Sequence, residues 1–100
     1  MAKYLITYHG GTPPSDPAAM TQVKAAFAKW LGEAGSAVID PGAPVRMVAQ
    51  VANGTPAPSA DIGGYSIVEA ASADEVISLL KRHPFVARGG TLQVSEAVSI

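Results

Sequence analysis

Gly63–Glu75 has the sequence GGYSIVEAASADE and carries the clearest structural signal of the chain, a strand that runs directly into a helix. Tyr65–Val68 is rich in aromatic and β-branched residues and follows a diglycine break, which is typical of a strand. Ser72 and Glu75 have the spacing of a capping box, which predicts a helix start. The expected elements of this stretch are a strand over residues 62–70 and a helix over residues 73–82.

The other elements follow from hydrophobic periodicity and from breaks at glycine and proline. Asp16 and Pro17 predict a helix start, since an N-cap acceptor precedes a proline at the first helical position. Gly35 suits the end of that helix. Its apolar stripe consists of Met20, Val23, Phe27, Trp30 and Leu31, and the second helix turns Val76, Ile77, Leu79 and Leu80 inward. The remaining expected strands are Ala2–Tyr8, Ser36–Ile39 and Thr91–Ala97, with Val45–Val51 as an extra edge strand and residues 55–61 as a surface loop.

The resulting order is β-α-β-β-α-β, the split βαβ or ferredoxin-like arrangement. One hundred residues form a single domain, residues 1–100, of the α+β class, with an antiparallel sheet and both helices on one face. The other face is not fully polar, because the strand Ala2–Tyr8 has apolar residues on both sides. A hydrophobic content of 48% against 15% charged residues therefore predicts a homodimer that covers this face.

Composition excludes several classes of function. The seven basic residues form no large cluster, which argues against nucleic-acid binding, and no apolar run approaches the roughly 20 residues of a membrane helix. The absence of cysteine removes disulfides and thiolate catalysis, and with no signal-peptide core after Met1 it predicts a cytoplasmic protein. With two histidines and no cysteine, a metal site is not expected. Gly10-Gly11 lacks the lysine of a phosphate-binding loop, so no cofactor is expected either.

Several segments together resemble the YciI-like (YCII-related) family, small proteins of the dimeric α+β barrel group. The matching segments are Gly63–Ala70, Ser72–Glu75, His83–Phe85, Gly89–Val94, Trp30-Leu31 with Gly35, and the turn Asp40–Pro44. The resemblance implies a dimeric barrel and, for some members, an enzymatic role of a paired histidine and aspartate. The chain departs from the family in two places. No histidine lies between Asp16 and Glu33, where the first-helix histidine is expected, and Asn53–Pro56 differs from the Asp-Gly-Pro-Phe signature of one branch.

One edge of the expected sheet collects the candidate site residues. The C-terminal ends of the first two strands meet the start of the Tyr65 strand there, so His9, Asp40 and Tyr65 should border one pocket. Imidazole titrates near neutrality, which makes His9 the candidate acid or base and Asp40 its partner. The candidate ligand-binding residues are Tyr65, Arg46, His83 and Arg88.

Each candidate also has a structural interpretation. His9 could be an exposed loop histidine, His83 the residue that ends a helix, and Asp40 part of an Asx-type turn. Two functions therefore remain open. The chain is either a small-molecule enzyme that uses His9 in acid–base chemistry, or a non-catalytic ligand-binding or assembly domain on the same dimeric barrel.

Overall fold

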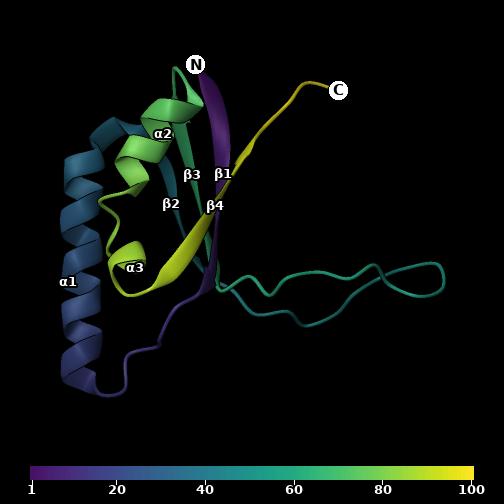
Figure 1. The fold of residues 1–100 in the computed structure, drawn as a ribbon, viewed down its shortest axis with the longest axis horizontal. Helices are drawn as coiled ribbons and strands as arrows, with labels where there is room; N and C mark the ends of the chain where they lie inside the picture. Colours follow the sequence, from purple (N-terminus) through teal and green to yellow (C-terminus); the bar gives the residue numbers. More distant parts are fainter.

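The computed structural model describes residues 1–100 and shows an α+β fold, in which helices cover one face of a four-stranded sheet (Figure 1). The elements are β1 (Ala2–Gly10), α1 (Pro17–Ala34), the 3-10 turn η1 (Gly35–Ala37), β2 (Val38–Pro44), β3 (Gly64–Ala70), α2 (Ala73–Leu80), α3 (Pro84–Ala87) and β4 (Gly90–Glu96). The strand order is β2-β3-β1-β4, and every neighbouring pair is antiparallel. This arrangement confirms the predicted ferredoxin-like fold class.

Side-chain caps set both predicted helix starts. Asp16 Oδ1 accepts a hydrogen bond from the Ala19 amide at 2.7 Å and begins α1. Ser72 Oγ accepts from the Glu75 amide at 3.3 Å and begins α2. The Glu75 carboxylate reaches back and accepts from the amide of Ala71, the residue before the cap, at 3.0 Å. Such reciprocal bonds satisfy amides that have no partner inside a helix.

The core lies between the sheet and the helices. Its buried apolar members are Tyr4, Ile6, Val68 and Ala70 from the sheet, Trp30 from α1, and Val76 and Leu80 from α2. The Trp30 indole N–H donates to the Leu79 carbonyl at 3.2 Å, which ties α1 to α2. Two residues expected in the core, Met20 and Ile77, are exposed. Met20 lies in the first turn of α1, and Ile77 flanks the buried stripe of the short helix α2.

Two strands extend beyond their predicted ends. β1 continues through His9 and Gly10, because these residues pair with Thr91 and Gly90 of β4. The structure therefore corrects the expected loop at His9. Helix α3 at Pro84–Ala87 adds a short element that was not predicted.

The largest correction concerns β2, which runs through the prolines expected to end it. An edge strand tolerates Pro41 and Pro44 where bulges interrupt the ladder, and the β2–β3 register shifts on both sides of Asp40. Gly42 has φ 74° and lies so close to Tyr65 that an added Cβ would be 1.7 Å from its carbonyl oxygen. The bulge therefore requires glycine at this position.

Val45–Val51 is not a strand, contrary to expectation, because no strand of the same chain lies beside it. It belongs to a segment, Val45–Gly63, that has no regular secondary structure and is exposed throughout; we name it the arm. The arm leaves the sheet on the side away from the helices (Figure 1). Bonds from the Val45 amide to the Gly63 carbonyl at 3.0 Å, and from the Gly63 amide to the Tyr8 carbonyl at 2.7 Å, fix its base. None of the helices has the length and apolar character needed to cross a membrane.

Candidate functional site

The two histidines belong to two hydrogen-bonded clusters on opposite faces of β1. Successive residues of a strand point to opposite faces. Tyr8 therefore points toward the helices, where it meets His83, whereas Thr7 and His9 point to the bare face. We name these groups the His83 cluster (Tyr8, Ser66, His83) and the His9 cluster (Thr7, His9 and the Asp61 carbonyl).

The His83 cluster is a hydrogen-bond chain with one direction. The Phe85 amide donates to His83 Nδ1 at 3.0 Å, so Nδ1 carries no proton. In the neutral ring Nε2 therefore carries it and donates to the Tyr8 hydroxyl at 2.8 Å. Tyr8 then donates to Ser66 Oγ at 2.8 Å, and Ser66 donates to the Pro41 carbonyl at 2.8 Å. Every polar group in this chain has its partner.

Aromatic rings enclose His83, which is only 2% exposed. Its ring centroid lies 4.3 Å from that of Trp30 and 5.6 Å from that of Phe27. Burial, and secondarily the positive charge of Arg88, lower the pKa of His83 from 6.5 to about 4. The ring is therefore neutral at pH 7, and it joins β1, β3 and α3 as a structural element.

The His9 cluster has a different order of groups. The Asp61 carbonyl can only accept, so His9 Nδ1 donates to it at 3.0 Å. In the neutral ring Nε2 is then an acceptor and receives the Thr7 hydroxyl proton at 2.8 Å. Thr7 is 5% exposed and His9 is half-buried. A hydroxyl, an imidazole and an orienting acceptor in this sequence form the arrangement that activates a hydroxyl or removes a proton from a bound group.

Asp40 does not join His9, contrary to the expected pocket. Asp40 pairs with Ile67 of β3, which pairs with Leu5 of β1, and His9 lies four residues further along β1. This separates the two residues by about 13 Å along the strand direction. The prediction assumed that β2 ended at Asp40. Instead the strand continues, and the Asp40 carboxylate accepts from the Gly42 amide at 2.8 Å within the bulge.

The other predicted site residues are divided between two places. Tyr65 pairs with Thr7 in the register and is half-buried beside the His9 cluster. His83 and Arg88 lie on the helix side, where the Arg88 guanidinium lies 5.6 Å from the centre of the Phe85 ring. Arg46 is exposed in the arm, apart from both clusters.

The sequence did not single out three hydroxyls of the two clusters, those of Thr7, Tyr8 and Ser66. One signal was available for Ser66, because it alternates with Gly64 and Val68 on the core face of β3. A buried hydroxyl requires a partner, so a serine at a core-facing position indicates a polar network.

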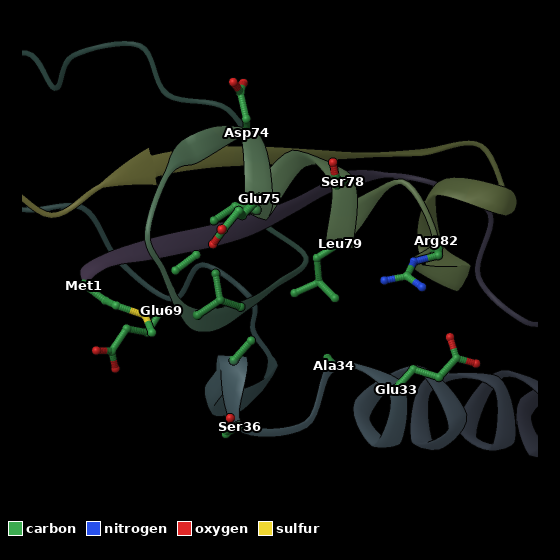
Figure 2. A pocket seen from close by; sticks show the side chains of 14 residues that line it. Met1, Glu33, Ala34, Ser36, Glu69, Asp74, Glu75, Ser78, Leu79 and Arg82 are labelled. Carbon is green, nitrogen blue, oxygen red and sulfur yellow. The ribbon is translucent and has the colours of Figure 1, made fainter.

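A hollow with a volume of about 800 Å³ lies elsewhere, between the end of α1, η1, the end of β3 and α2. Figure 2 shows Leu79 and Arg82 side by side on one wall of the hollow and Glu33 of α1 on the facing wall. Its other acidic residues include Glu69, Asp74 and Glu75, which is engaged in the α2 cap. No histidine lines this hollow. The hollow and the candidate acid–base residues therefore lie in different places.

Comparisons with known proteins identify the fold. No family model and no curated protein matches the chain. Among solved structures, the chain is similar to the 5-chloro-2-hydroxyhydroquinone dehydrochlorinase of Burkholderia phenoliruptrix AC1100, determined as a complex with 2,5-dihydroxybenzoquinone. The TM-score is 0.55 at 22% sequence identity, and the match covers 91% of this chain and 90% of the other. The chain therefore shares its fold with an enzyme.

Proposed function

We propose that the chain is a small-molecule enzyme in which His9 acts as a general acid or base on the bare face of the sheet. One observation carries this proposal: the His9 ring is oriented by the Asp61 carbonyl at 3.0 Å, with Nε2 toward the Thr7 hydroxyl at 2.8 Å. In this orientation Nε2 takes a proton from Thr7, or from a ligand group that replaces its hydroxyl. The carbonyl then continues to accept from Nδ1–H and stabilises the imidazolium.

The substrate class that we propose is a small, hydroxylated ring compound or carbonyl compound. Tyr65 adds an aromatic ring beside the His9 cluster, and such a ring packs well against a flat ligand. The similarity in fold to an enzyme that was solved with 2,5-dihydroxybenzoquinone supports this choice of class. We place the reaction in the cytoplasm, in keeping with a chain without cysteine.

We also propose that the enzyme is a homodimer whose bare sheet faces pack together. Leu5 of β1 and Ile39 of β2 are exposed in the single chain, and Ile67 of β3 is only half-buried. These side chains lie on the bare face of the sheet, away from the helices. Contact between two such faces would remove them from water, which favours association.

A non-catalytic ligand-binding domain is the second candidate, and one observation favours it. Both nitrogens of His9 are already bonded within the chain, so the ring has no free acceptor until the Thr7 hydroxyl turns away. In that case Tyr65 and the sheet face would bind a ligand that His9 does not transform.

Proton exchange tests the proposal without knowledge of the natural substrate. The probe is 2,5-dihydroxybenzoquinone in D2O, together with a panel of small enolisable ketones, and proton NMR follows the loss of C–H signals. We expect the protein to accelerate exchange and the His9→Gln variant to be about 100-fold slower or worse. Asp40→Asn is the matched control and should exchange at the original rate. Equal rates in the parent and His9→Gln proteins would reject the enzyme, and ligand binding without exchange would select the second candidate.

A further inference from the structure

The arm carries apolar side chains that nothing in its own chain covers. Met47 is 62% exposed, Val48 is 86% exposed and Val51 is 99% exposed. Beyond the base, one hydrogen bond from Gln50 to Ser59 at 3.1 Å joins the two legs of the arm. Ordering a chain segment costs conformational entropy, which buried contacts normally offset. The arm buries no residue within its own chain, so its apolar side chains are open to contact with a second molecule.

The accessible surface area of the single chain is larger than that of a compact monomer of the same length. The accessible area is 6996 Å², whereas a compact monomer of this length exposes about 5,300 Å². The excess of about 1,700 Å² exceeds the roughly 800 Å² that each partner buries in a standard interface. The radius of gyration is 14.9 Å, compared with about 13 Å for a compact domain of this length.

The direction of the arm indicates which face of the sheet a second molecule would cover. Figure 1 shows the arm and the C-terminal tail leaving the sheet on the same side, opposite the helices. The tail ends in Val98 and Ile100, which are also exposed. The bare face thus has an apolar segment projecting at each end of the strands, and a body placed on this face contacts the arm as well.

We propose that two copies of this chain lie with their bare faces together and that the arm of each copy packs against the other copy. This inference rests on the face-to-face dimer of the proposed function and adds the arm to its interface. A two-fold dimer uses the same surfaces on both copies, so one apolar arm and one apolar face per chain are sufficient. A second copy suits the arm better than an anionic partner, because Arg46 is the arm's single basic residue.

The test measures dimer dissociation by analytical ultracentrifugation of the full chain. The arm variant combines Met47→Ser, Val48→Ser and Val51→Ser, and the face variant is Leu5→Asp. The matched control combines Ile77→Ser and Val86→Ser, two exposed apolar residues on the helix layer. We expect the arm variant to raise the dissociation constant about 100-fold, and the control to change it less than about 3-fold. Hydrogen exchange provides a second measure, since amides of residues 45–52 should be protected in the dimer and exposed on dilution.

The outcomes distinguish the contribution of the arm to the dimer from that of the bare face. If Leu5→Asp weakens the dimer while the arm variant does not, the arm inference is wrong and the face-to-face dimer stands. If the parent protein is monomeric at all concentrations, or if neither variant changes the dissociation constant, both are wrong. Weakening by both variants, together with protected arm amides, supports the exchanged arm.

Discussion

His83 and His9 are matched in hydrogen bonding and differ in burial. Each ring has both nitrogens bonded, but aromatic side chains enclose His83, whereas His9 is half-buried on the face that no helix covers. The enclosed ring has a pKa of about 4 and completes a chain in which each donor has one acceptor. A histidine's hydrogen bonds alone therefore do not distinguish a structural role from a chemical one. The surroundings of the ring do.

The largest effect is expected where the enclosure of His83 is removed. Trp30→Ala deletes the ring nearest to His83 and the bond to the Leu79 carbonyl, so we expect a loss of about 3–5 kcal/mol in the free energy of unfolding. Urea denaturation measures this, with Met20→Ala on the exposed part of the same helix as the control. A loss below about 1 kcal/mol would show that the ring does not contribute to the core.

The next effect is a pH dependence of stability that comes from His83. Its folded pKa of about 4 lies below the ordinary value of 6.5, so the unfolded chain takes up the proton first. Stability is therefore complete above about pH 6.5 and falls as the pH drops to about 4, by on the order of 2 kcal/mol. Thermal unfolding between pH 7 and pH 4 measures the slope. His83→Gln should flatten it and His9→Gln should not; an unchanged slope in His83→Gln would contradict the assignment.

A smaller loss is expected from breaking the chain of hydroxyls. Ser66→Ala leaves the Tyr8 hydroxyl without its acceptor and the Pro41 carbonyl without its donor, which should cost about 1–3 kcal/mol. Ser95→Ala, at an exposed position of β4, is the control and should change stability by less than about 0.5 kcal/mol. Equal stability of the two variants would mean that water replaces the missing hydroxyl.

The smallest effect on stability is expected at His9. Glutamine can keep one bond to the Asp61 carbonyl or to Thr7, so His9→Gln should change the free energy of unfolding by less than about 0.5 kcal/mol. The same variant should no longer accelerate proton exchange, so that His9 would have a chemical role and His83 a structural one. A loss of 2 kcal/mol or more in urea denaturation would instead give His9 a structural role like that of His83.

The fold was predictable because its signals are local. Asp16 and Ser72 each cap the helix that follows by accepting from the amide three residues on, and the alternation in β1 and β3 is visible within single strands. The site was not predictable in the same way. The His83 cluster joins residues 58 and 75 positions apart in the sequence, and no local pattern reports such a contact.

The expected pairing of His9 with Asp40 failed for a physical reason. It depended on where β2 ends. Two prolines indicated an end at Asp40, but the bulges around Asp40 and Gly42 allow the strand to continue. The place expected for an aspartate carboxylate is occupied by the main-chain carbonyl of Asp61. A backbone acceptor can come from any residue type, so the sequence contains no sign of it.

The bulges and prolines of β2 also determine how the molecule can aggregate. Strands add to a sheet through regular, unpaired edges, and prolines with register shifts make β2 a poor template for such addition. β4 at the opposite edge has a regular register and no proline. A sheet with one receptive edge can pair once, β4 against β4, and the resulting dimer presents only β2 edges. For the single chain, edge addition therefore stops after one step.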